Sequence, residues 1–160
     1  DQLPPFEDYS MSQRTYRYAD AVPLYPFGYG LSYTQFSYQD LSLEKQTIKP
    51  GEELHISLTI GNTGSVHGDE IVQVYLSKLN ASVPVPKYSL VDFQRIALPP
   101  GEQMQVSFVI TPEMMSYYDL EGKLILEPGS FRIEIGGCSP GKRGQELGAP
   151  MPLQAVFKIT

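Results

Sequence analysis

Apolar and polar residues alternate along several segments of the chain. From Leu54 to Ile60 every second residue is Leu or Ile, and the residues between them are His55, Ser57 and Thr59. A period of two is typical of a β-strand with one buried and one solvent-facing side. We therefore expect His55 to face solvent.

The same alternation predicts further strands. Val72, Val74 and Leu76 alternate with Gln73, Tyr75 and Ser77, which predicts a second half-buried strand. Other expected strands are Val91–Leu98, Gln103–Ile110, Lys123–Leu126, Phe131–Ile135 and Leu153–Ile159. We expect four side chains on four different strands to point into the core: Leu58, Val74, Phe108 and Ile133.

Turn residues separate these segments. Pro50-Gly51, Pro100-Gly101 and Pro128-Gly129 each stand just ahead of a predicted strand. About eight short strands with such punctuation favour an all-β fold, an antiparallel two-sheet β-sandwich. The chain has no Trp and a single cysteine, so it matches the fibronectin type III variety better than an antibody-type domain. The one expected helical turn is Pro112–Ser116, with Thr111 as its cap.

The N-terminal part has a different character. Ten of the eighteen Phe and Tyr residues lie between Phe6 and Tyr38, and no regular period runs through them. We therefore expect an irregular, aromatic-rich arm over residues 1–34 and the sandwich over residues 35–160. Because contiguous apolar surface normally marks a contact, the arm is expected to lie against another surface.

Charge and composition exclude several classes of partner. The 160 residues carry a net charge of -6 and have a pI near 4.8, which disfavours binding to phosphate backbones. No apolar stretch is long enough to cross a membrane. Two histidines and one thiol cannot form a closed zinc site without carboxylates, so we expect no metal and no cofactor. The start at Asp1 suggests a piece of a larger polypeptide.

The chain offers no evident catalytic constellation. Neither histidine has a nucleophile turn to serve. The candidate carboxylate pairs are all sequence neighbours, at Glu7-Asp8, Glu52-Glu53 and Asp69-Glu70. Adjacent strand residues point to opposite faces, so such a pair cannot flank one glycosidic bond, and we interpret these residues as solvated surface charge.

Several motifs, in order, resemble one family. They begin with Arg14-Thr15-Tyr16-Arg17-Tyr18 and continue as Pro26-Phe27-Gly28-Tyr29-Gly30-Leu31-Ser32-Tyr33-Thr34, Gly61-Asn62-Thr63-Gly64, Gly68-Asp69-Glu70-Ile71-Val72-Gln73-Val74-Tyr75, Leu90-Val91-Asp92-Phe93, Leu98-Pro99-Pro100-Gly101-Glu102 and Pro128-Gly129-Ser130-Phe131. Together they closely resemble the C-terminal fibronectin type III-like domain of family 3 glycoside hydrolases, with the linker that precedes it. The sequences Leu3-Pro4 and Arg14-Thr15-Tyr16-Arg17-Tyr18 are more similar to the β-xylosidase branch than to the β-glucosidase branch.

The resemblance implies a non-catalytic, accessory module. In this family of retaining β-glycosidases the catalytic aspartate and glutamate lie in upstream domains, so the implied partners are the catalytic domains of the same polypeptide. The parent is expected in the secretory pathway, a lysosome or the extracellular space. The residues expected to dock onto those domains are Arg14, Tyr16, Arg17, Tyr18, Phe27, Tyr29 and Tyr33.

An alternative hypothesis is a carbohydrate-binding module in which Tyr16, Tyr18, Tyr25 and Tyr29 stack on sugar rings. Asn80-Ala81-Ser82 is a possible N-glycosylation site. Gln13 and Cys138 depart from the Gly and Ser that the family commonly has. The Gly- and Pro-rich stretch from Cys138 to Pro152 is expected to be a mobile loop.

Overall fold

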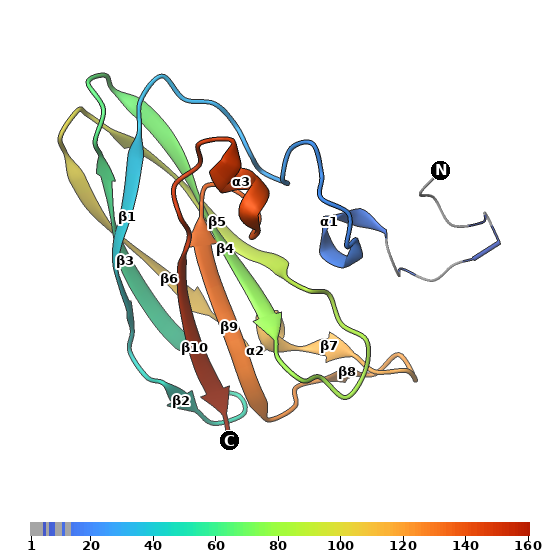
Figure 1. The fold of residues 1–160 in the computed structure, drawn as a ribbon. Helices are drawn as coiled ribbons and strands as arrows, with labels where there is room; N and C mark the ends of the chain where they lie inside the picture. The colour runs from blue at the N-terminus through green and yellow to red at the C-terminus, as the bar shows by residue number, and fades with distance from the viewer. Residues whose placement is uncertain (1–4, 6, 9–10, 12–13) are drawn as a thin grey trace.

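The computed structural model describes residue 5, residues 7–8, residue 11 and residues 14–160. The expectations for Leu3-Pro4, Phe6 and Gln13 lie outside these residues. Two sheets pack face to face, and the chain is an all-β sandwich, as expected (Figure 1). One sheet has the order β1 (Phe36–Leu43), β3 (Leu54–Asn62), β6 (Gln103–Ile110). The other has the order β2 (Thr47–Ile48), β10 (Leu153–Ile159), β9 (Gly129–Gly136), β4 (Gly68–Lys78), β5 (Ser89–Leu98).

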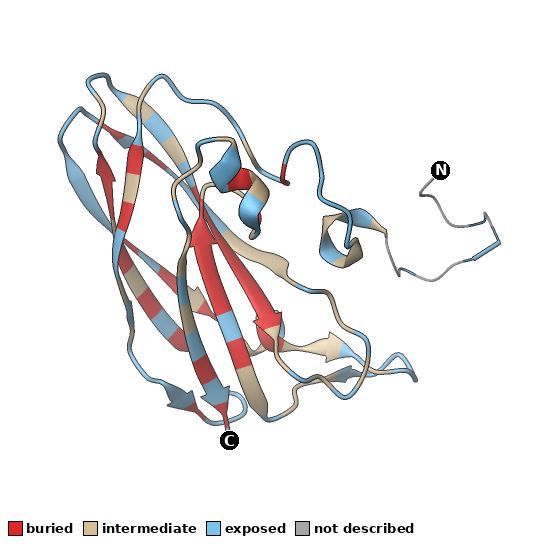
Figure 2. Cartoon of the chain, viewed as in Figure 1, coloured by how far each residue is buried: buried red, intermediate tan, exposed pale blue. Residues whose placement is uncertain are grey.

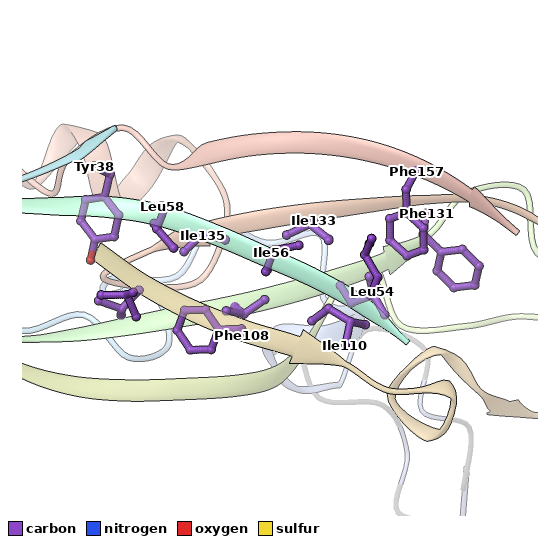
Figure 3. Close-up of a cluster of buried hydrophobic side chains, with 14 of the residues drawn as sticks. Tyr38, Leu54, Ile56, Leu58, Phe108, Ile110, Phe131, Ile133, Ile135 and Phe157 are labelled. Atoms are coloured by element: carbon purple, nitrogen blue, oxygen red, sulfur yellow. The ribbon is translucent and has the colours of Figure 1, made fainter. Parts of the chain in front are cut away.

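The core lies between the two sheets. Leu58, Val74, Phe108 and Ile133 are all buried, which confirms the predicted inward register on four strands. Figure 3 shows side chains of β3 and β6 meeting those of β9 and β10 in one apolar cluster. Side-chain packing across this layer supplies the main stabilisation of a sandwich.

β10 lies between β2 and β9 in the five-stranded sheet, although it is the last strand along the chain. It pairs antiparallel with β9 over all seven of its residues, from Leu153 to Ile159. On its other side it pairs parallel with the two-residue strand β2. Phe157 of β10 stacks on Phe131 of β9, with ring centroids 5.4 Å apart. Its pairing with β2 thus joins residues that are more than one hundred positions apart in the sequence.

The prediction of half-buried strands was right for β3 and wrong for β4. His55 of β3 is exposed, as expected. In β4, however, Gln73, Tyr75 and Ser77 are buried together with the inward residues between them. Figure 2 shows the C-terminal halves of β4 and β9, each ending in its arrowhead, as continuously buried. Something therefore covers the outer face of the five-stranded sheet at this point.

Short elements complete the structure. α2 (Pro112–Met115) is the predicted helical turn, but the side chain of Thr111 makes no capping hydrogen bond. α1 (Thr15–Tyr18) lies in the arm, and α3 (Lys142–Glu146) lies in the stretch expected to be a mobile loop. β7 (Tyr117–Tyr118) and β8 (Leu124–Ile125) form a separate hairpin. Within the described ranges, no helix is both long and apolar enough to span a membrane.

Candidate functional site

The arm is fixed to the outer face of β4 through Gln73. The side-chain Nε2 of Gln73 donates hydrogen bonds to the carbonyl oxygens of Gly28 (3.3 Å) and Gly137 (2.6 Å). Its Oε1 accepts a hydrogen bond from the hydroxyl of Tyr75 at 2.6 Å. Buried polar groups are costly unless they are paired, and here every polar group of the Gln73 amide has a partner. Gln73 is therefore a structural anchor rather than a solvent-facing residue.

Gly28 packs directly against the side-chain amide of Gln73. Its φ is +76°, in the left-handed region that favours glycine, and a Cβ built on it would lie 2.2 Å from Oε1 of Gln73. Beside it, the backbone N–H of Ser139 donates to the carbonyl oxygen of Phe27 at 2.8 Å. The arm and the segment after β9 thus cover the sheet together.

Aromatic rings extend this contact from the sheet to the arm. Tyr75 of β4 meets Tyr88 edge-on, with ring centroids 5.9 Å apart. Tyr88 in turn contacts Tyr16 of α1, also at 5.9 Å, and Tyr16 stacks on Phe27 at 4.3 Å with an interplanar angle of 7°. Such ring pairs stabilise a contact beyond the area they bury.

The loop over residues 79–88 holds the start of the arm. The backbone N–H of Lys87 donates to the carbonyl oxygen of Arg17 at 2.8 Å, and the Arg17 guanidinium donates to Oγ of Ser89 at 2.7 Å. The ammonium of Lys87 donates to the carbonyl oxygen of Ala19 and forms an ion pair with Asp20. Both backbone and side-chain contacts therefore fix α1.

The segment around α3 holds the middle of the arm. The hydroxyl of Tyr29 donates to the carbonyl oxygen of Leu147 at 2.7 Å, and Nε of Arg143 donates to that of Leu24 at 3.1 Å. The stretch from Cys138 to Pro152, expected to be a mobile loop, contains the short helix α3 and contacts the arm through these hydrogen bonds. Its mobility stays a prediction.

A buried polar residue fixes the end of the arm at the start of β1. Oδ1 of Asn62 accepts hydrogen bonds from the Thr34 hydroxyl (2.6 Å) and the Gly64 backbone (3.1 Å). Its Nδ2 donates to the carbonyl oxygens of Val66 (2.8 Å) and Leu98 (2.9 Å). One side chain thus joins the arm, the β3–β4 turn and the end of β5.

Glu70 lies beside this junction and departs from the prediction of a solvated surface charge. The hydroxyl of Tyr38 donates to Oε1 of Glu70 at 2.9 Å. Burial raises the pKa of the Glu70 carboxyl, although hydrogen bonds from Tyr38 and the Ile71 backbone act in the opposite direction. Glu70 lines a pocket of about 470 Å³ between the arm and the α3 segment. Its charge is therefore partly removed from water.

The side of the arm that faces away from the sandwich is apolar and uncovered. Leu31 is 90% exposed and Tyr33 is fully exposed. Three more large apolar residues of the same segment are also exposed: Val22, Leu24 and Tyr25. An arm held by so many hydrogen bonds cannot simply fold these side chains away, so this exposed face is the candidate functional site.

The residues predicted to dock divide into four groups. Tyr16, Arg17 and Tyr29 contact the chain's own sandwich, whereas Tyr33 faces away from it. Phe27 stacks on Tyr16 and remains 46% exposed.

The last group, Arg14 and Tyr18, is half-buried at α1. The sequence interpretation missed Leu24 and Leu31, which only their place on the arm identifies. It also missed the anchor Gln73, whose polar side chain in an alternating strand gave no sign that the outer face of the sheet was covered.

Stacking of sugars on the four candidate tyrosines finds little support in their arrangement. Tyr25 is the one ring among them that is largely exposed, and it lies 6.0 Å from the ring of Tyr29. One face of Tyr16 is covered by Phe27. A sugar platform needs several open ring faces, so carbohydrate binding remains a prediction without a built site.

The carboxylates do not form a glycosidase pair. Asp69 forms an ion pair with Arg95 on the outer face of the sheet, whereas Glu70 contacts Tyr38 of β1. The two therefore point in opposite directions, as the strand period predicts. Among the residues that the structure describes, no group of three potential ligands could hold a metal ion. Asn80 is exposed in the loop over residues 79–88, and its glycosylation stays a prediction.

Comparison with known proteins agrees with this architecture. Residues 70–139 match the family described as fibronectin type III-like domain. A β-xylosidase of Formosa agariphila is 40% identical over 124 residues, and a periplasmic β-glucosidase of Salmonella typhimurium is 38% identical over 134 residues. These matches cover 78% and 82% of this chain but only 17% and 18% of the two relatives.

A solved structure is similar over most of the chain. The β-glucosidase of Erythrobacter marinus superimposes with a TM-score of 0.77 at 35% identity, covering 92% of this chain and 18% of that protein. The chain thus corresponds to a small part of each of these larger proteins.

Proposed function

We propose that this chain is the C-terminal fibronectin type III-like domain of a family 3 glycoside hydrolase. In that enzyme it is a non-catalytic module that docks onto the catalytic domains of its own polypeptide and stabilises them. The parent enzyme would hydrolyse terminal β-linked sugars, as the names of its relatives suggest. We further infer that the parent is exported from the cytoplasm, since one relative is a periplasmic enzyme.

The exposed apolar face of the arm carries this proposal. Hydrogen bonds through Gln73, Tyr29 and Lys87 hold the arm in place, so its exposed side chains are presented on a fixed backbone. Leu31 and Tyr33 lie at the end that enters β1, where they are almost entirely exposed. Large apolar patches on a rigid surface are typical of protein interfaces. The inner side of the arm, which contacts the sandwich, then includes Tyr16, Arg17 and Tyr29. Phe27 can contact both the sandwich and the catalytic domains.

A double substitution tests the docking. Leu31→Ser with Tyr33→Ser in the full-length enzyme should lower the free energy that holds the module to the catalytic domains by about 3 kcal/mol, because two buried apolar side chains are lost. Thermal unfolding and limited proteolysis of the full-length enzyme measure this loss. The chemical step of the remaining folded enzyme should be nearly unchanged.

Two controls make the result specific. The same double substitution in the isolated chain should leave its thermal midpoint nearly unchanged, since both side chains are already in solvent there. Val156→Thr alters another exposed apolar residue, on β10, and should have no effect in either context. Equal stability of the full-length enzyme with and without the double substitution would contradict docking through the arm.

A further inference from the structure

The β7–β8 hairpin presents a second apolar surface, at some distance from the arm. Tyr118 and Leu124 are directly opposite each other in the hairpin register, so their side chains lie on the same face. They are 67% and 50% exposed, and Leu120 in the connecting turn is 84% exposed. Single exposed apolar residues are common, but three on one short projection are not explained by the sandwich itself.

The turn of this hairpin is rigid. Oδ1 of Asp119 accepts hydrogen bonds from the backbone N–H groups of Glu121 and Lys123, both at 2.9 Å. The backbone N–H of Asp119 donates to the Lys123 carbonyl oxygen at 3.0 Å, and Gly122 has a φ of +77°. A turn held in this way loses little conformational freedom when a partner binds.

The base of the hairpin is anchored to the sandwich. The Nζ of Lys78 donates to the carbonyl oxygens of Glu127 (3.0 Å) and Pro128 (2.8 Å), just after β8. The hydroxyl of Tyr117 donates to the carboxylate of Glu127. Only the outer part of the hairpin, which carries the three apolar side chains, is left without such support.

A continuous series of contacts joins the hairpin to the arm. The Ser82 hydroxyl donates to the Glu127 carboxylate at 2.6 Å, so the loop over residues 79–88 binds the base of the hairpin. The other end of this loop binds the arm through Lys87. In Figure 1 the hairpin and α1 extend from the same side of the sandwich.

We propose that the β7–β8 hairpin is a second docking element for the catalytic domains of the same polypeptide, an inference that rests on the function proposed above. The occupant follows from two observations. The two relatives compared are five to six times as long as their matched part, so most of such a polypeptide lies outside these residues. The hairpin is also joined to the arm through the loop over residues 79–88 and extends from the same side of the sandwich as α1, so one large partner can cover both.

Hydrogen exchange of the backbone tests this assignment. Amides of residues 117–125 should exchange at least about tenfold more slowly in the full-length enzyme than in the isolated chain, because docking would oppose the local opening through which these exposed amides exchange. Leu120→Ser with Leu124→Ser in the full-length enzyme should return these amides to the rates of the isolated chain. Val66→Ser, at an exposed apolar residue in the β3–β4 turn, should leave the protection intact.

The outcomes separate the two proposals. If residues 19–33 are protected in the full-length enzyme but residues 117–125 are not, the hairpin assignment is wrong and docking through the arm stands. If neither segment is protected, both proposals fail. If protection appears in the isolated chain as its concentration rises, together with the mass of a dimer, the partner is a second copy and the assignment is overturned. Leu120→Ser alone, in the turn, replaces the double variant if the latter does not fold.

Discussion

At the scale of single residues, the contact between Tyr38 and Glu70 makes the stability of the fold at the junction of arm and sandwich depend on pH. Tyr38 is buried on β1, and burial together with the neighbouring Glu70 raises the pKa of its phenol, so the hydroxyl stays protonated and donates. Burial also raises the pKa of Glu70. A carboxyl with a raised folded pKa stabilises the fold fully below its unfolded pKa, and this contribution is lost as the pH rises through the folded value.

Glu70→Gln should therefore change the pH dependence of stability. Glutamine retains an oxygen that accepts the Tyr38 hydroxyl but carries no charge to desolvate. The variant should gain stability relative to the wild type as the pH rises from about 4 to 7, starting from the unfolded carboxyl pKa near 4.3. Urea unfolding across this range measures the difference. Glu53→Gln, in an exposed turn, is the control, and parallel curves for wild type and Glu70→Gln would contradict the expectation.

At the scale of elements, the arm behaves as part of the sandwich although it has no regular structure over most of its length. It binds β4 through Gln73, the loop over residues 79–88 through Lys87 and the α3 segment through Leu147. Each of these contacts joins segments more than forty residues apart in the sequence. The arm's position is thus set by tertiary contacts and not by local propensity.

Two glycines in the arm provide a matched test of this attachment. Gly28→Ala should lower the free energy of unfolding by about 1–3 kcal/mol, because alanine is strained at a positive φ and its Cβ would collide with Gln73. Gly30→Ala should cost little, since no atom lies within 4 Å of the position of its Cβ. Urea unfolding of both variants compares them, and equal losses would mean that the Gln73 contact does not fix the arm.

At the scale of the whole molecule, the carboxylates in the described part of the chain lack the paired arrangement of a glycosidase, which fits the docking role proposed above. Retaining glycosidases hold two carboxyl groups about 5–5.5 Å apart, and inverting enzymes about 6.5–9.5 Å apart, on either side of the bond. Here Asp69 is paired with Arg95, and Glu70 faces Tyr38 on the other side of β4. Neither carboxylate has a second one across a substrate-sized cleft in the described part of the chain.

The isolated chain should accordingly release no p-nitrophenol from p-nitrophenyl β-xyloside or β-glucoside. A sensitive absorbance assay with purified chain measures this, and Glu70→Gln serves as the matched control. Turnover by the wild type that disappears in this variant would show that a carboxylate of this chain is catalytic. Equal traces in both would indicate a contaminating enzyme.

The strands could be predicted well because alternation is a local property. β6 and β10 begin and end where the pattern predicts, and His55 faces solvent. The burial of Gln73 could not be predicted, because its cover comes from residues 28 and 137, far away in the sequence.

α3 was missed for a related reason. Its central Gly144 is a poor helix former, but a Cβ there would lie 2.6 Å from the Cys138 sulfur. β2 and β7 have two residues each, which is too short to produce a pattern. The exposed face of the arm could not be predicted either, since the sequence shows the aromatic density of the arm but not which of its side chains face inward.

The place of β10 has a consequence for biosynthesis. The ribosome makes this strand after all others in the domain, yet β2 joins the five-stranded sheet only through it. While the chain is being synthesised, Phe131 and the apolar arm lack parts of their final environment, and non-local pairing of this kind is slow. The sandwich can therefore close only after translation has passed Ile159. Because β10 joins β2 to the rest of the five-stranded sheet, the sandwich can present its finished surface only after this strand has been made.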